Sequence, residues 1–181
     1  MKTFKSIIMV KYPRQVVWET IRDRLPEMVP FLDDVAAITQ EYRQEHAEGS
    51  LQLINIWKAD ITIPPMLQSV IDPSTLSWTD RAEWHESQNT CHWAIEPHFF
   101  LNRIRCSGTT QFEQAIGGRG TRINFEGELE VTAKDFPGLP AFMEAAATQA
   151  IESLVASLIP KNFRKVTDAL SHLLTQDRSP N

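Results

Sequence analysis

The sequence predicts an α+β fold in which a sheet of consecutive strands is covered by one long C-terminal helix. Six segments between Val35 and Val131 alternate apolar and polar residues at a period of two, and short turns join most of them. From Ala141 to Leu174, apolar residues recur at spacings of three and four, which is typical of an amphipathic helix. Strands joined by short turns pair antiparallel, and the apolar face of such a sheet needs a cover. The terminal helix is the long apolar element left to supply that cover.

The N-terminal segment predicts one strand followed by two short helices. Residues 4–10 have the pattern of a strand. Pro13 then opens a helix, because proline is tolerated at the first helical position. Pro26 ends that helix and begins a second one, whose apolar residues are Met28, Val29, Phe31 and Leu32.

The middle of the chain predicts strands alone. They are expected at residues 35–46, 51–60, 76–85, 90–96, 104–114 and 117–131. Two apolar segments without strand periodicity interrupt them, ITIPPMLQSVI at residues 61–71 and PHFFLN at residues 97–102. Apolar loops of this kind fold onto their own core or form a lid. We expect these two to form the rim of a cavity, if there is one.

The C-terminal apolar pattern continues across Pro160, which predicts one kinked helix or two helices in series. The pattern consists of Met143, Ala147, Ile151, Leu154 and Leu158, then Phe163, Val166, Leu170, Leu173 and Leu174. Residues 1–176 are expected to form a single domain, since 181 residues suit one domain. Residues 177–181 are expected to be a polar tail.

Composition argues against several classes of partner. The net charge of -5 and the pI of about 5.5 disfavour nucleic-acid binding and docking on anionic lipid, both of which need a basic surface. No apolar run has the length of a membrane span, so stable membrane insertion is not expected. The apolar stretch in the N-terminal MKTFKSIIMVKYP is too short for a signal peptide. With two cysteines and no disulfide framework, the sequence favours a cytoplasmic location.

This order of elements resembles the helix-grip fold of the START, Bet v 1 and polyketide-cyclase superfamily (SRPBCC). The resemblance rests on the layout, the PRQVVWETIRD helix after the first strand, the strands that carry Trp57 and Trp84, the last strand GTRINFEGELEV and the helix from Pro140. It covers nearly the whole chain. It implies a seven-stranded antiparallel sheet curled around the C-terminal helix, with two short helices between strands one and two. It also implies a cavity for an apolar ligand between the sheet and the helix. The HAEGS turn departs from the glycine-rich loop of the plant allergen branch.

Two glycines fall where strand side chains should fill the core. Gly127 lies on the apolar phase of the last strand, and Gly108 on that of the preceding strand. A glycine there leaves nothing to pack, and it can also mark a bend. One interpretation is an open cavity, in which case Gly127→Val would damage binding more than folding. The alternative is that the alanine-rich EAAATQA part of the helix packs tightly over both glycines.

Three polar residues share the apolar phases of their strands: Asn55, Asp80 and Thr110. A buried carboxylate is costly unless it is paired, hydrogen-bonded, protonated or hydrated. Asp80 is therefore the candidate catalytic residue, as an acid or base, or a contact for the polar end of a ligand. A strand end or bulge that exposes Asp80 to solvent is the alternative.

Neither a metal nor a cofactor is expected. The sequence has no HExxH, CxxC or GxSxG motif. His85 and His92 should lie near each other, but a metal would need a third ligand such as Glu83 or Glu86. Cys91 and Cys106 lie on apolar phases and are interpreted as small buried hydrophobes. Whether these two cysteines approach closely enough to pair is left open by the sequence.

The resemblance implies binding of an apolar small molecule, lipid-like or polycyclic, by a carrier or sensor. A cyclase- or aromatase-type enzyme acting in the same cavity is the second hypothesis, and a protein-interaction module with a filled pocket is the third. No catalytic signature is present, which favours binding over catalysis. The ligand's identity and the oligomeric state stay open. The expected ligand-binding residues are Asn55, Trp57, Trp78, Asp80, Trp84, Trp93, Gly108, Thr110, Phe125, Gly127, Met143 and Ile151.

Overall fold

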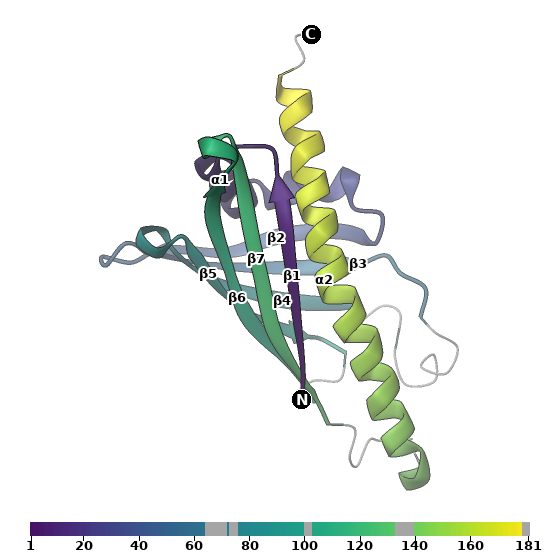
Figure 1. The fold of residues 1–181 in the computed structure, drawn as a ribbon. Helices are drawn as coiled ribbons and strands as arrows, with labels where there is room; N and C mark the ends of the chain where they lie inside the picture. Colours follow the sequence, from purple (N-terminus) through teal and green to yellow (C-terminus); the bar gives the residue numbers. More distant parts are fainter. Residues whose placement is uncertain (64–71, 73–75, 100–102, 133–139, 179–181) are drawn as a thin grey trace.

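The computed structural model describes residues 1–63, 72, 76–99, 103–132 and 140–178. Its described strands form one antiparallel sheet of seven, in the order β1-β7-β6-β5-β4-β3-β2. The predicted helix-grip architecture is confirmed: the sheet curls around a long C-terminal helix (Figure 1). Most of both segments expected to form a rim, residues 64–71 and 100–102, lies outside the described residues.

The elements follow the predicted order closely. The strands are β1 (Lys2–Val10), β2 (Val35–Glu45), β3 (Ser50–Ala59), β4 (Ser77–His85), β5 (Thr90–Pro97), β6 (Ile104–Ala115) and β7 (Gly120–Val131). The helices are α1 (Arg14–Asp23), the 3-10 helices η1 (Leu25–Phe31), η4 (Glu86–Gln88), η5 (Ile116–Gly118) and η6 (Ala141–Met143), and α2 (Glu144–Asp177). Of the two alternatives for the C-terminus, the structure has one continuous helix with Pro160 inside it.

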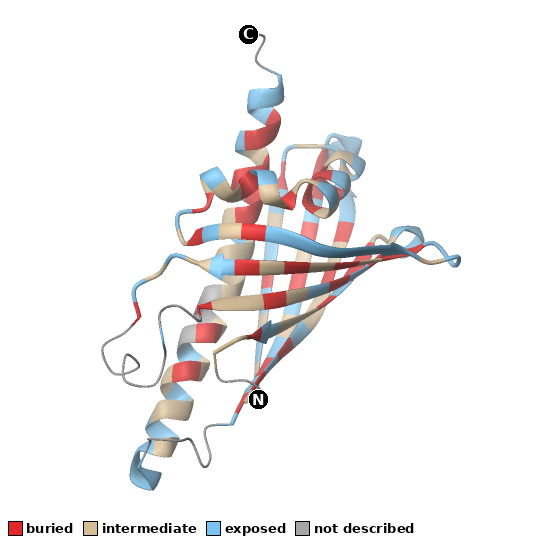
Figure 2. Ribbon diagram, turned by 180° about the vertical axis from the view of Figure 1, so that it is seen from behind, coloured by how far each residue is buried: buried red, intermediate tan, exposed pale blue. Residues whose placement is uncertain are grey.

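Burial alternates along the strands, as a sheet with one face on the core requires (Figure 2). In β7, Thr121, Ile123, Phe125 and Leu129 are buried, whereas the glutamates between them are exposed. The buried faces of the strands and one face of α2 share a single apolar core. Fully burying one such aliphatic or aromatic side chain contributes about 1.5–3 kcal/mol.

α1 adds an aromatic corner to this core. Trp18 is 2% exposed and meets Trp84 edge to face, with ring centroids 4.9 Å apart. It meets Phe112 in the same way at 5.2 Å. Edge-to-face contacts place the positive ring edge on the negative ring face. α1 is thereby fixed to β4 and β6 at one end of the sheet.

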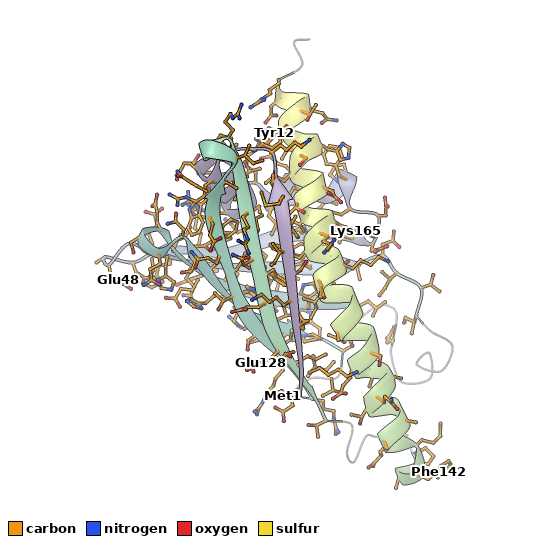
Figure 3. The ribbon with its side chains drawn as sticks, viewed as in Figure 1. Met1, Tyr12, Glu48, Glu128, Phe142 and Lys165 are labelled. Carbon is orange, nitrogen blue, oxygen red and sulfur yellow. The ribbon has the colours of Figure 1, made fainter. Side chains whose placement is uncertain are left out.

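Polar contacts hold the C-terminal half of α2 in place. Lys165, labelled in Figure 3, pairs with Asp34 in the turn before β2. Arg24 binds Asp177 at the end of the helix, with 2.7 Å between Nη1 and Oδ2. The hydroxyl groups of Tyr12 and Thr175 lie 3.2 Å apart. These partners come from the segments that flank α1 and η1, so the helix is anchored at that end.

None of the described helices combines the length and the apolar character that crossing a membrane requires.

Candidate functional site

A cavity of about 190 Å³ lies between the sheet and α2. Its wall comes from β3, β4, β5, β6, β7, α1, η1 and α2, together with the ends of two loops. The lining residues are Ile21, Arg22, Leu25, Leu53, Asn55, Trp57, Ala59, Ile61, Leu76, Trp78, Asp80, Ala82, Trp84, Cys91, Trp93, Ile95, Pro97, Phe99, Thr110, Phe112, Phe125, Val155, Ile159, Asn162, Phe163 and Val166.

Aromatic rings form much of this wall. Trp57 and Trp78 are directly opposite each other on β3 and β4, and their rings stack at 5.5 Å with an angle of 18°. Phe125 stacks on Trp93 at 4.9 Å and on Phe163 of α2 at 4.2 Å. These near-parallel rings link the sheet to the helix on one side of the cavity. They offer flat, rigid, apolar surfaces to a ligand.

Two polar side chains face each other within this apolar wall. Asn55 of β3 and Asp80 of β4 are directly paired in the sheet, so both point to the cavity side. Burial raises the pKa of Asp80 to about 6, while Trp57 and Asn55, whose polar groups lie beside the carboxylate, act in the opposite direction. The Asp80 carboxyl is therefore poised to titrate near neutral pH inside an apolar cavity.

Several buried polar atoms of the lining make no hydrogen bond within the described part of the chain. They are the indole nitrogens of Trp57, Trp84 and Trp93 and the Oδ1 atom of Asn162. Burying such a group without a partner costs about 1–3 kcal/mol. Three donors and one acceptor of the cavity wall are thus left without a hydrogen-bond partner among the described residues.

A single cation lies among the described lining residues, and it is already neutralised. Arg22 of α1 binds Asp23 through two hydrogen bonds of 2.9 and 2.7 Å. The hydrogen bond to Asp23 is the largest influence on the pKa of Arg22, which lies above its ordinary value. Arg43 of β2 also donates to Asp23, at 2.9 Å. The arrangement offers little attraction to an anionic ligand.

The structure brings eight of the twelve sequence-predicted site residues into this cavity: Asn55, Trp57, Trp78, Asp80, Trp84, Trp93, Thr110 and Phe125. The other four, Gly108, Gly127, Met143 and Ile151, are absent from its described lining. Met143 is 45% exposed, next to the protruding Phe142 at the far end of the helix (Figure 3). Ile151 is buried, on the same half of α2.

The interpretation of the two glycines as open space is wrong, because an indole fills that space. Trp93, Gly108, Gly127 and Phe4 form one row across β5, β6, β7 and β1. A Cβ on Gly127 would lie 2.6 Å from Trp93 Cη2 and 2.8 Å from Phe4 Cζ. A Cβ on Gly108 would clash with Trp93 Cζ2 and with the backbone. The alternative, close packing of the alanine-rich helix on both glycines, does not describe these contacts either.

The sequence did not indicate the contribution of α1 and η1 to the cavity, and it pointed to different residues of α2. α1 and η1 supply Ile21, Arg22 and Leu25, and the middle of α2 supplies Val155, Ile159, Asn162, Phe163 and Val166. The α2 residues have helical spacing, which places them on one face. That spacing was readable from the sequence, but nothing in it showed which half of the helix faces the cavity.

The remaining histidines and cysteines do not assemble a metal site in the described residues. His85 and His92 lie near each other on the outer face, with ring centroids 5.3 Å apart. Cys91 is opposite Thr110 and Cys106 opposite Ile95, and both thiols are free and buried. Burial raises the pKa of Cys106 to about 12 and that of Cys91 well above its ordinary value.

Comparison with solved structures identifies the fold. The protein TTHA0849 of Thermus thermophilus superposes with a TM-score of 0.67 at 18% identity, over 98% of this chain and 100% of that chain. The Zhui aromatase/cyclase of a Streptomyces species superposes with a TM-score of 0.67 at 15% identity, over 98% of this chain and 96% of that chain. Ara h 8.0201 superposes with a TM-score of 0.55 at 15% identity, over 94% of this chain and 98% of that chain.

No family model matches the sequence, and the search of curated proteins found no match. At these identities the structural matches establish architecture rather than activity. The chain has the helix-grip fold shared by Bet v 1-like proteins and polyketide aromatase/cyclases.

Proposed function

We propose that the protein binds an apolar small molecule, lipid-like or polycyclic, in the cavity between the sheet and α2, and acts as its carrier or sensor. The observation that carries this proposal is the cavity of about 190 Å³ with its predominantly apolar lining. An apolar ligand that enters this lining removes its own surface from water, and each Å² of apolar surface buried contributes about 25 cal/mol.

The lining suits a neutral and largely apolar molecule. Among the described lining residues, Arg22 is paired with Asp23 and Asp80 is the one carboxylate. Trp57, Trp78 and Phe125 present flat surfaces. Named neighbours of the same fold include an aromatase/cyclase, which agrees with a cavity that takes an apolar organic molecule.

Native mass spectrometry of the protein purified under gentle conditions, followed by thermal shift against apolar compounds, tests this proposal. We expect a one-to-one complex and a rise in the melting temperature, because a ligand that binds the folded state stabilises it. Ala82→Phe places a ring inside the cavity and should abolish both signals. Arg81→Phe, on the outer face of the same strand, should leave them intact. If nothing co-purifies and no compound shifts the melting temperature, the proposal fails.

A second function, cyclase-type catalysis, draws support from one specific feature. Asp80, beside Asn55 in an apolar cavity, has a pKa of about 6, which suits a general acid or base near neutral pH. Conversion of an apolar polyketide-like substrate that falls at least about a hundredfold in Asp80→Asn would support it. Equal activity of both proteins would remove Asp80 from the reaction. The third hypothesis, a filled pocket, gains no support from a cavity of this size.

A further inference from the structure

Three side chains of the cavity wall that carry polar groups lie together on β3 and β4. Asn55 and Asp80 are directly opposite each other on β3 and β4, and Trp57 follows Asn55 on the same face of β3. Asn55 is 4% exposed and Trp57 is 7% exposed. Leu53, Trp78 and Ala82, the neighbours of this group on the inner face, are apolar. The group is therefore an isolated polar spot in an apolar wall.

One donor in this group has no settled partner. Trp57 and Asn55 lower the pKa of Asp80, because their polar groups lie beside its carboxylate. Yet the indole nitrogen of Trp57 completes no hydrogen bond with good geometry within the described residues. A buried N–H in that condition costs about 1–3 kcal/mol, which a ligand atom placed next to it can recover. The spot therefore holds a donor without a well-formed hydrogen bond next to a carboxylate acceptor.

Few functional groups satisfy both atoms. A hydroxyl oxygen accepts from the Trp57 N–H while its proton is donated to the Asp80 carboxylate. A ketone or ether accepts from the indole but brings a second oxygen against the carboxylate with no proton between them. A carboxylate ligand adds like charge in an apolar site, and a primary ammonium cannot accept the indole proton. Of these groups, the neutral hydroxyl is the one that satisfies both atoms.

The rest of the ligand is constrained by the rings around this spot. Trp57 stacks on Trp78, and Phe125 stacks on both Trp93 and Phe163, with interplanar angles of 18°, 9° and 11°. Each stacked pair presents a flat, rigid apolar surface, which suits a flat molecule. A cavity of about 150 Å³ already holds benzene. The 190 Å³ found here therefore admits one or two fused rings.

We propose that the cavity takes a planar aromatic molecule of one or two rings that carries a hydroxyl group, held between the Trp57 N–H and the Asp80 carboxylate. This inference rests on the proposed function, because it names the chemistry of the ligand for the same cavity. It assigns Asp80 and Trp57 a recognition role that the fold alone does not imply.

Isothermal titration with three matched probes tests the inference: naphthalene, 2-methoxynaphthalene and 2-naphthol. At about pH 7.5 the Asp80 carboxyl is ionised, because its pKa is about 6. We expect 2-naphthol to bind at least about tenfold more tightly than naphthalene, as a hydrogen bond to a charged group allows. The methoxy compound has the same rings and cannot donate a proton, so it should bind no better than naphthalene.

Two variants locate the preference. Asp80→Leu fills a similar volume but removes the carboxylate, so it should reduce the 2-naphthol affinity to that of naphthalene. Trp57→Phe keeps a ring on Trp78 but removes the N–H, and should weaken 2-naphthol about threefold or more while sparing naphthalene. Glu83→Leu, on the same strand but facing outward, is the matched control and should keep the full preference. The wild-type probe series decides the matter even if Asp80→Leu does not fold.

The outcomes separate this inference from the proposed function. Binding of all three probes with equal affinity overturns the hydroxyl anchor and leaves the apolar cavity as the binding site. A hydroxyl preference that survives in Asp80→Leu and Trp57→Phe also overturns the anchor. Failure of every probe, together with nothing co-purifying from cells, overturns both. A preference for 2-naphthol that is lost in both variants and kept in Glu83→Leu supports the anchor.

Discussion

The Cη2 atom of Trp93 lies 2.6 Å from the point where a Cβ on Gly127 would stand. The indole therefore occupies the space that this glycine leaves, after crossing Gly108 on the strand between. In that position it stacks on Phe125 at 4.9 Å with an angle of 9°. Because Gly108 and Gly127 have no side chains, the Trp93 indole can lie over them and form part of the cavity wall.

Gly127→Val should destabilise the fold. Valine suits a strand, so propensity does not penalise it, but its side chain enters the space held by Trp93 and Phe4. Overpacking of this kind costs about 1–3 kcal/mol in the free energy of unfolding. Urea denaturation measures the loss. Glu128→Val, at the next and outward-facing position, should change the free energy by less than about 0.5 kcal/mol.

A double-mutant cycle identifies the cause. If Trp93 is the obstacle, Gly127→Val costs less in a Trp93→Leu background than in the wild type. Equal losses in both backgrounds would show that the backbone, which also lies close to this position at Ser107 O, sets the penalty.

Asp80 should make stability depend on pH. Burial raises its pKa from 3.8 to about 6, so the folded state binds a proton more tightly than the unfolded state does. This contribution is fully present below about pH 4 and is lost as pH rises to about 6, by up to about 3 kcal/mol. Arg22 and Cys91, the other ionisable groups of the described lining, do not titrate in this range, since both of their pKa values are raised.

Urea denaturation of the wild type and Asp80→Asn between about pH 4 and pH 8 tests this dependence. The variant keeps the shape of the side chain but cannot ionise. Its stability relative to the wild type should therefore increase up to about pH 6 and then level off. A difference that is constant across the range would mean that water or a partner keeps the Asp80 carboxylate as well solvated as in the unfolded chain.

Cys91 should report on the occupancy of the cavity, whereas Cys106 should not. Both thiols are buried with raised pKa values, so both should react slowly with a thiol reagent. Cys91 lines the cavity and Cys106 is not part of its described lining. Labelling of Cys106→Ser, which retains Cys91, should slow severalfold with a bound aromatic compound, while labelling of Cys91→Ser should not. Equal protection of both would indicate global stabilisation.

Ligand binding should change tryptophan emission through four of the five tryptophans. Trp57, Trp78, Trp84 and Trp93 line the cavity, while Trp18 packs behind Trp84 and is absent from the described lining. Trp18→Phe should therefore keep the full change in emission on titration. Loss of the change in that variant, with binding confirmed by calorimetry, would place the ligand elsewhere.

The fold was predictable because alternation is a local property of a chain. The periodic segments from Val35 to Val131 correspond to β2 through β7 within a few residues, and short turns imply antiparallel pairing. The phases also marked Asn55, Asp80 and Thr110 as inward-facing polar residues, and all three line the cavity. The two-residue alternation within each strand therefore indicates which of its residues face the core.

Contacts between residues far apart in the sequence, and the part of α2 that faces the cavity, could not be predicted in this way. Trp93 and Gly127 are far apart in the sequence, and their contact depends on the register of three strands. Met143 and Ile151 share the periodicity of Phe163 and Val166, but the cavity lies against the second pair. Where a helix crosses a sheet is set by tertiary packing, which a single sequence does not encode locally.

A crystal structure of the protein with 2-naphthol would show whether the cavity between the sheet and α2 binds a hydroxylated aromatic molecule. We expect the naphthol rings between the sheet and α2, against Trp57, Trp78 or Phe125, with the hydroxyl oxygen within hydrogen-bond distance, about 2.6–3.2 Å, of both Asp80 and Trp57 Nε1. A cavity closed by rearranged side chains, with naphthol bound solely on the outer surface, would contradict this expectation.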